Sequence, residues 1–200
     1  MPPPNYLHDD PFIACFEQVA IPTECRELIK LAESKLMPST VLSERGEVYS
    51  QRRISEQVWL PHQSQAIVYQ LSQRIAAIVD RPINHAEHLQ IARYQIGGKF
   101  DVHSDCYDLN TVAGREAAFQ NGQRIVTAML YLNTPDMGGE TFFPELNLQI
   151  SPSEGKLLVF ENCKRGSTEP HPCSIHAGLP VKKGQKWIAN LWFCQDPFVW

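Results

Sequence analysis

The chain lacks the patterns that mark several common protein classes. It has no run of about 18 continuous apolar residues, which argues against a transmembrane helix. Its formal net charge of -4 is modest, so we expect neither a nucleic-acid partner nor a membrane-surface partner. The opening residues, MPPPNYLHDDPF, lack the basic and apolar regions of a secretory signal, and a cytoplasmic protein is expected.

The six cysteines also lack a recognisable spacing. No Cys-x-x-Cys occurs, so the sequence offers no zinc-ribbon or thioredoxin-like motif. The cysteines are dispersed along a chain without a secretory signal, which favours reduced thiols over disulfides.

What the chain does have is a change of pattern near residue 86. Before it, residues 22–36 and 63–80 carry apolar residues at helical spacing. After it come short apolar or alternating runs separated by glycine- and proline-containing turns, which is typical of antiparallel strands in a barrel or jelly roll. We therefore expect an α+β fold: a disordered segment over residues 1–12, then one domain over 13–200, with a helical part at about 13–85 and a jelly-roll part at about 86–196.

The stretch VHSDCYD places His103 and Asp105 two residues apart at the end of an expected strand. Residues at i and i+2 of a strand point to the same face, so the two side chains could converge on a metal or substrate. A solvated turn would also accommodate them. His176, in CSIHA, is a candidate third ligand, or else a hydrogen-bonded core histidine. Two histidines and one carboxylate select non-haem Fe(II), and we expect two non-adjacent strands to bring them together across the barrel mouth.

Lys186 could supply a cation to the same interior. It lies ten residues after His176 and could return on the neighbouring antiparallel strand. There it would pair with the distal carboxylate of 2-oxoglutarate, although a surface lysine is the alternative. The alternation of Lys186, Ile188, Asn190 and Trp192 puts these four side chains on one face.

Several motifs, in a fixed order, make the chain resemble a known family. They are ARYQIGGKFDVHSD, RIVTAMLYLNTPDMGGETFFP, PSEGKLLVFEN, CSIHAGLPV and GQKWIANLW. From about residue 14 to 195 the sequence resembles the prolyl 4-hydroxylase family of Fe(II)/2-oxoglutarate-dependent dioxygenases. The resemblance implies a double-stranded β-helix core, Fe(II), 2-oxoglutarate and O2 as cosubstrates, and ascorbate as a candidate reductant.

The resemblance also implies roles for individual residues. By position these are iron ligands at His103, Asp105 and His176, the 2-oxoglutarate partner at Lys186, cosubstrate-pocket residues at Tyr94, Thr141 and Trp192, and a substrate-side cation at Arg124. Core aromatics, an ordinary strand threonine and a surface arginine are the alternatives for the last four.

Phe100 departs from the family pattern, because it stands where the family often carries a tyrosine near the substrate. This departure bears on substrate identity rather than on reaction type. The retained Asp105 favours hydroxylation, since halogenating relatives replace this carboxylate with a small residue.

We therefore expect hydroxylation of an unactivated C–H bond, favouring a prolyl residue in a peptide or protein, with release of succinate and CO2. A free amino acid or other small molecule is the alternative substrate, and a non-catalytic metal-binding or oxygen-sensing module is the alternative class. The polar segments 43–55 and 106–123 are long for simple connections, and we expect them to cover the substrate.

Overall fold

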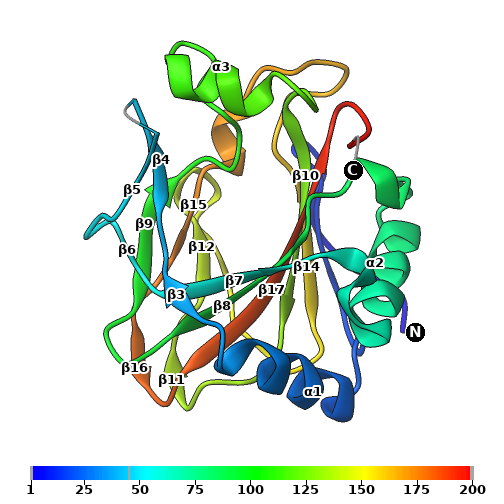
Figure 1. Cartoon of the computed structure of the whole chain (residues 1–200), viewed down its shortest axis with the longest axis vertical. Helices are drawn as coiled ribbons and strands as arrows, with labels where there is room; N and C mark the ends of the chain where they lie inside the picture. Colours follow the sequence, from blue (N-terminus) through cyan, green and yellow to red (C-terminus); the bar gives the residue numbers. More distant parts are fainter. Residues whose placement is uncertain (1, 45, 199–200) are drawn as a thin grey trace.

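Two antiparallel β-sheets face each other, and two helices cover the outer face of the larger sheet (Figure 1). The structure is a computed structural model, and it describes residues 2–44 and 46–198. In this part of the chain, no helix combines the length and the apolar character needed to cross a lipid bilayer.

Short strands dominate the chain, as the turn-rich second half predicted. The helices are α1 (Pro22–Glu33), α2 (Ala66–Ile78) and α3 (Val112–Ala118), with 3-10 turns at His62–Ser64, Ile83–His85, Pro144–Leu146 and Pro172–Ser174. The strands are β1 (Asn5–His8), β2 (Ile13–Phe16), β3 (Met37–Pro38), β4 (Val41–Ser43), β5 (Gly46–Val48), β6 (Arg53–Ile54), β7 (Glu56–Leu60), β8 (Leu89–Tyr94), β9 (Lys99–His103), β10 (Arg124–Tyr131), β11 (Met137–Gly138), β12 (Thr141–Phe143), β13 (Leu148–Ile150), β14 (Leu157–Glu161), β15 (His176–Gly178), β16 (Val181–Lys183) and β17 (Lys186–Cys194).

The larger sheet has the order β1-β2-β14-β10-β17-β8-β7-β3, and the smaller has the order β13-β12-β15-β9-β6. In both sheets, most neighbouring strands come from distant parts of the sequence, and these strands pair antiparallel. This arrangement confirms the expected α+β class with a jelly-roll core.

Period-two alternation in the central strands separates two cores. In β10, Val126, Ala128 and Leu130 face the helices and join one cluster of buried residues. Met129 and Tyr131 face the smaller sheet and join the other. Successive strand residues point to opposite faces, so one strand supports the helical layer while it lines the space between the sheets.

The two predicted helices form, but each is shorter than its periodic segment. Pro22 lies at the start of α1, where its missing N–H costs no hydrogen bond, and Glu24 accepts the N–H of Ile21 at 2.9 Å. The apolar stripes of α1 and α2, which include Leu28 and Leu71, are buried against the larger sheet.

The expected boundaries of the first half need correction. Residues 5–8 are not disordered, because β1 pairs with β2 and Tyr6 packs on Phe12 with ring centroids 5.9 Å apart. The part expected to be helical also contributes β2, β3 and β7 to the larger sheet and β6 to the smaller one. These four strands are only two to five residues long, which is too short to show a clear alternation, and their pairings were therefore not predicted.

The two segments expected to cover the substrate have local structure of their own. Residues 43–55 include the end of the β4–β5 hairpin and all of β6. Residues 106–123 contain α3, whose first turn is capped by the Thr111 side chain accepting the N–H of Gly114 at 3.0 Å. Contacts between α3 and β4, which ends at Ser43, place the second segment beside the start of the first.

Candidate functional site

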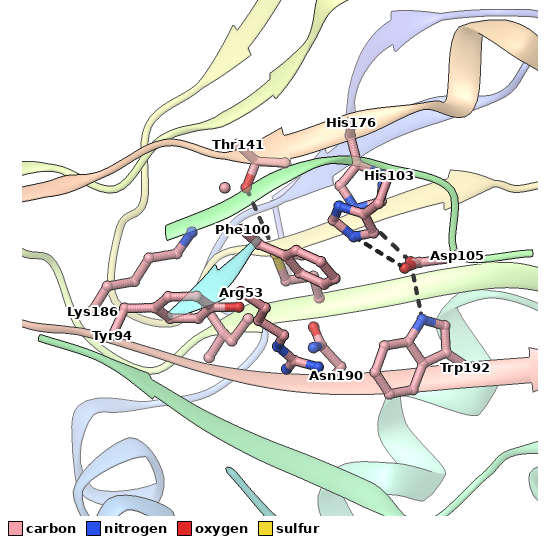
Figure 2. A pocket seen from close by; sticks show the side chains of 13 residues that line it. Arg53, Tyr94, Phe100, His103, Asp105, Thr141, His176, Lys186, Asn190 and Trp192 are labelled. Atoms are coloured by element: carbon pink, nitrogen blue, oxygen red, sulfur yellow. Dashed lines mark hydrogen bonds and ion pairs between the residues drawn. The ribbon is translucent and has the colours of Figure 1, made fainter. Parts of the chain in front are cut away.

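A pocket opens between the two sheets and contains most of the residues singled out from the sequence (Figure 2). Both sheets contribute side chains to it, as does β6 at the edge of the smaller one. Its lining consists of Arg53, Tyr94, Phe100, His103, Asp105, Met129, Thr141, His176, Gly178, Lys186, Ile188, Asn190 and Trp192.

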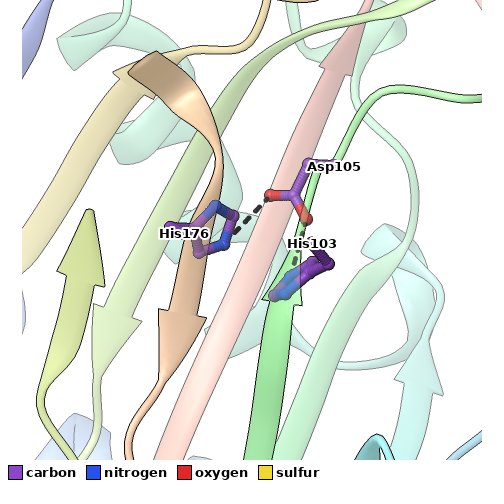
Figure 3. A group of neighbouring side chains, drawn as sticks. All are labelled: His103, Asp105 and His176. Carbon is purple, nitrogen blue, oxygen red and sulfur yellow. Dashed lines mark ion pairs between the residues drawn. The ribbon is translucent and has the colours of Figure 1, made fainter. Parts of the chain in front are cut away.

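His103, Asp105 and His176 form a compact cluster at one end of the pocket (Figure 3). One ligand atom from each residue lies within 4.8 Å of the others. Nε2 of His103 is 3.5 Å from Oδ1 of Asp105, and Nε2 of His176 is 3.9 Å from Oδ2. These separations are slightly wider than the roughly 3 Å expected between neighbouring ligands about 2.1 Å from an octahedral ion, so a small contraction would enclose one metal.

Neighbouring strands bring the two histidines together, not the non-adjacent strands that we expected. β9 and β15 pair directly, and His103 lies opposite His176 in the ladder. Asp105 follows the end of β9 by two residues. The sequence does not reveal which strands pair, so the adjacency of β9 and β15 could not be predicted.

Backbone carbonyls orient both imidazole rings toward Asp105. Nδ1–H of His103 donates to the carbonyl of Asp101 at 2.8 Å, and Nδ1–H of His176 donates to the carbonyl of Ser174 at 3.0 Å. This tautomer leaves the Nε2 lone pair of each ring facing the cluster. Metal-binding histidines are commonly held in this way, so the rings are prepared for a metal.

The protonation states of the cluster also suit a cation. Burial, together with the charge of His103, lowers the pKa of His176 to about 4, so this ring is neutral at pH 7. Burial by itself would raise the pKa of Asp105, but the nearby His176 and His103 outweigh it and hold this pKa well below its usual range. A buried carboxylate beside a neutral imidazole attracts a metal ion.

A buried hydrogen-bond network holds the carboxylate of Asp105. Its Oδ2 accepts the Thr127 hydroxyl at 2.6 Å and the indole N–H of Trp192 at 3.0 Å. The Thr127 oxygen in turn accepts Nδ2–H of Asn162 at 2.9 Å. Because Oδ2 already has these two donors, Oδ1 is the oxygen left for a metal.

We expect replacement of Thr127 by valine to weaken metal binding. The change keeps the side-chain volume but removes the hydroxyl that orients Asp105, and loss of such an outer partner typically costs about 10- to 100-fold in metal affinity. Calorimetric titration with Co(II) measures the effect. Thr127→Ser retains the hydroxyl and should bind Co(II) nearly as the wild type does; equal affinity in Thr127→Val would contradict this role.

Lys186 reaches the pocket from the larger sheet, where it lies opposite Tyr94 in the β17–β8 ladder. We expected it on a strand beside β15; the structure instead places it on the facing sheet. It is 3% exposed, and among residues 2–44 and 46–198 its Nζ has no hydrogen bond and no ion pair. Burial lowers the pKa of Lys186 to about 8, and the negative charge of Glu140 only partly opposes this.

Aromatic and hydroxyl groups surround this buried ammonium. Its Nζ lies 5.5 Å from the ring centroids of both Tyr94 and Tyr131. The Thr141 hydroxyl lies 2.8 Å from the Tyr131 hydroxyl. In Figure 2, Lys186 and Tyr94 lie toward one end of the pocket, and Asp105 and Trp192 toward the other. A ligand with an anionic tail could therefore extend from Lys186 to the histidine cluster.

Phe100 closes one side of the cluster. Its ring stacks on that of His103, with centroids 3.5 Å apart and planes 12° apart. The Arg53 guanidinium also lies over the Phe100 ring, 4.9 Å from its centroid. The phenyl ring shapes the pocket but offers no hydrogen bond, in contrast to a tyrosine at this position.

Arg124 lies outside the pocket lining, in a buried pair with Glu87. Its Nη2 is 2.7 Å from Oε2 of Glu87, and its side chain is 17% exposed, so it is not the surface residue considered above. The guanidinium also stacks over Trp192, 4.1 Å from the ring centroid, and over Tyr107, at 4.8 Å. Glu87 therefore neutralises this cation, and Arg124 contacts the site through Trp192.

The sequence analysis did not predict several residues that belong to the site. Thr127, Met129 and Tyr131 alternate along β10, so the period of this strand could have indicated them. Arg53 and Glu87 had no such signal, because their positions depend on pairings between distant segments. Asn190 shared the predicted face of β17, and its buried Oδ1 makes no hydrogen bond among the described residues.

Comparison with known proteins agrees with this geometry. The sequence profile of the 2OG-Fe(II) oxygenase superfamily matches residues 89–194. A relative from Acanthamoeba polyphaga mimivirus, provisionally named a prolyl 4-hydroxylase, is 37% identical over 193 residues, which cover 95% of this chain and 78% of the relative. The human prolyl 4-hydroxylase subunit alpha-3 is 32% identical over 93% of this chain, which spans only 34% of that subunit.

A solved structure extends the comparison to the fold. The viral collagen prolyl hydroxylase from Paramecium Bursaria Chlorella virus-1, in complex with 2-oxoglutarate, matches with a TM-score of 0.72 and 27% identity. The match covers 91% of this chain and 95% of the viral chain. The chain therefore belongs to the prolyl 4-hydroxylase family within the 2OG-Fe(II) oxygenase superfamily.

Proposed function

We propose that this protein is an Fe(II)- and 2-oxoglutarate-dependent dioxygenase that hydroxylates prolyl residues in a peptide or protein. The observation that carries the proposal is one pocket containing both a three-ligand cluster and a buried ammonium that has no ion-pair partner among the described residues. Two histidines and a carboxylate suit Fe(II) and leave further coordination positions for a cosubstrate and O2. The ammonium supplies the charge that the distal carboxylate of 2-oxoglutarate requires.

The polar groups in and around the pocket have binding or orienting roles in this proposal. His103, Asp105 and His176 hold the metal, while Thr127 and Trp192 fix the carboxylate of Asp105. Lys186 pairs with the cosubstrate tail, and Tyr94 and Thr141 border it. With 2-oxoglutarate and O2, bound iron supplies the oxidising chemistry that releases succinate and CO2. The chain positions the substrate and excludes water.

The charges of the pocket favour a peptidyl substrate over a free amino acid. A free amino acid carries an ammonium as well as a carboxylate, and each needs a partner when it is desolvated. Asp105 is the only acid among the described residues that line the pocket, and the metal cluster occupies it. A prolyl residue inside a peptide has neither charge. The similar structure from Paramecium Bursaria Chlorella virus-1 is named a collagen prolyl hydroxylase, which agrees with this preference.

Direct competition tests the substrate class. We expect a short proline-containing peptide to gain one oxygen atom by mass spectrometry when it is mixed with equimolar free L-proline, and the free proline to stay unmodified. Reactions without 2-oxoglutarate serve as controls. Conversion of free proline with none of the peptide would favour the amino-acid alternative. If the metal-loaded protein released no succinate with any substrate, the non-catalytic module would be favoured.

Two finer points complete the proposal. Ascorbate would serve as the reductant that keeps the metal in the Fe(II) state. A cytoplasmic location stays a prediction from the sequence.

A further inference from the structure

A pair of cysteines lies immediately beside the Asp105 network. The Sγ atoms of Cys106 and Cys163 are 3.5 Å apart, and both residues are free thiols. Cys106 directly follows Asp105, and Cys163 directly follows Asn162. We propose that this pair is an oxidation site, at which hydrogen peroxide joins the two thiols in a reversible disulfide that weakens metal binding. The effect on the metal rests on the proposed function; the formation of the disulfide does not.

The geometry of the two thiols is close to that of a bond. A disulfide has an S–S distance of about 2.05 Å, so the two sulfur atoms need to approach by roughly 1.5 Å. Both thiols already converge on one acceptor, the carbonyl of Arg124, at 3.7 Å from Cys106 and 3.6 Å from Cys163. Between the other cysteines of residues 2–44 and 46–198 there is no comparable sulfur contact.

The pair lies beside a surface cavity that is separate from the catalytic pocket. Cys163 lines this cavity of about 580 Å³, together with residues that include Arg81, Lys164 and Arg165. Because Cys163 borders this cavity, it is the sulfur that peroxide meets first and the one that attacks it.

The reaction balances with peroxide as the oxidant. The Cys163 thiolate attacks one peroxide oxygen, the O–O bond breaks, and the released hydroxide takes a proton to become water. The Cys106 sulfur then attacks the resulting sulfenic sulfur, gives up its proton as the S–S bond forms, and displaces a second hydroxide, which takes that proton to become water. Two thiols lose two electrons and two protons in total, and a thiol reductant returns them.

Hydrogen bonds of Asn162 connect the proposed Cys106–Cys163 disulfide to two of the three metal ligands, Asp105 and His176. Its amide donates to Thr127, whose hydroxyl holds Asp105. Its carbonyl accepts the Ser174 hydroxyl at 3.0 Å and the Cys106 thiol at 3.4 Å, and the carbonyl of Ser174 orients His176. Drawing Cys106 and Cys163 together removes the thiol contact and moves the backbone beside both Asp105 and Asn162. Disturbing such outer partners typically lowers metal affinity by about 10- to 100-fold.

Peptide mapping tests the oxidation site. The metal-free full chain is treated with one to a few equivalents of hydrogen peroxide, and remaining thiols are blocked before digestion. We expect a linked peptide containing Cys106 and Cys163, which disappears after dithiothreitol. The linked peptide should be absent from Cys106→Ser and Cys163→Ser, and present in the matched control Cys173→Ser. The proposal would be overturned if Cys173 were oxidised while Cys106 and Cys163 were both recovered with the blocking group, which would show that they had stayed reduced.

A Co(II) titration of the same samples tests the consequence. After removal of peroxide, the disulfide form should bind Co(II) at least about tenfold more weakly than the reduced form, and dithiothreitol should restore the affinity. Cys163→Ser should keep its affinity after peroxide. Equal Co(II) affinity of the disulfide and reduced forms would overturn the effect on the metal. A reduced protein that bound no Co(II) would instead count against the proposed function, while the linked peptide would still establish the oxidation site.

Discussion

Replacing His103 or His176 with alanine is expected to abolish turnover and remove most of the metal affinity. The two imidazoles and Asp105 are the three ligands that the chain brings together, with donor atoms within 4.8 Å of one another. Loss of one imidazole leaves only two protein ligands for the metal. A buried carboxylate without a bound cation is also energetically unfavourable. Calorimetric titration with Co(II) and succinate release measure the two effects.

A histidine outside the cluster provides the control for this prediction. His8, in β1, contacts the carbonyl of Pro11 and none of the pocket residues. His8→Ala should bind Co(II) with the affinity of the wild type. Full metal occupancy together with normal turnover in His103→Ala or His176→Ala would show that the cluster is not the iron site.

Replacing Lys186 with alanine is expected to raise the 2-oxoglutarate requirement strongly while leaving the metal bound. A charge-assisted hydrogen bond contributes on the order of 1.5–3 kcal/mol, which corresponds to about a tenfold to hundredfold loss of 2-oxoglutarate affinity. Lys186 contacts none of the three ligands, so Co(II) affinity should stay near that of the wild type. Dependence of succinate release on 2-oxoglutarate concentration measures the change.

The pH dependence of 2-oxoglutarate binding separates charge from packing at Lys186. Burial lowers the pKa of this lysine to about 8, so the ammonium is present below that pH and is lost as pH rises through it. Wild-type affinity for 2-oxoglutarate should therefore fall between pH 7 and pH 9. Lys186→Arg keeps its charge over this range and should lose that pH dependence. An unchanged 2-oxoglutarate requirement in Lys186→Ala would assign the carboxylate to another cation, with Arg53, which also lines the pocket, as the candidate.

Local patterns in the sequence were sufficient for much of the fold and of the site. The apolar stripes of α1 and α2, and the alternation in β17, depend only on residues a few positions apart. The same holds for His103 and Asp105, whose two-residue spacing carried the first hypothesis. Lys186, Ile188, Asn190 and Trp192 all line the pocket, as the alternation in β17 predicted.

Contacts between distant segments could not be predicted in this way. Glu87 and Arg124 are 37 residues apart, and nothing local indicates that the carboxylate neutralises the guanidinium. Thr127 and Asn162 are 35 residues apart, and they meet because β10 pairs with β14. Cys106 and Cys163 are 57 residues apart in the sequence, so their spacing could not reveal a sulfur pair. Such positions depend on which strands become neighbours, and strand order has no short-range signal.

The assignment of this pocket as an Fe(II)- and 2-oxoglutarate-dependent hydroxylation site can be tested in one experiment. The protein is titrated with Fe(II) and 2-oxoglutarate without oxygen, and O2 is then admitted in the presence of a prolyl peptide. We expect 2-oxoglutarate to bind tightly only after Fe(II), with one of each per chain. We also expect O2 then to yield succinate and hydroxylated peptide in equal amounts. Binding of 2-oxoglutarate that is independent of Fe(II), or exposure to O2 that yields neither product, would contradict this assignment.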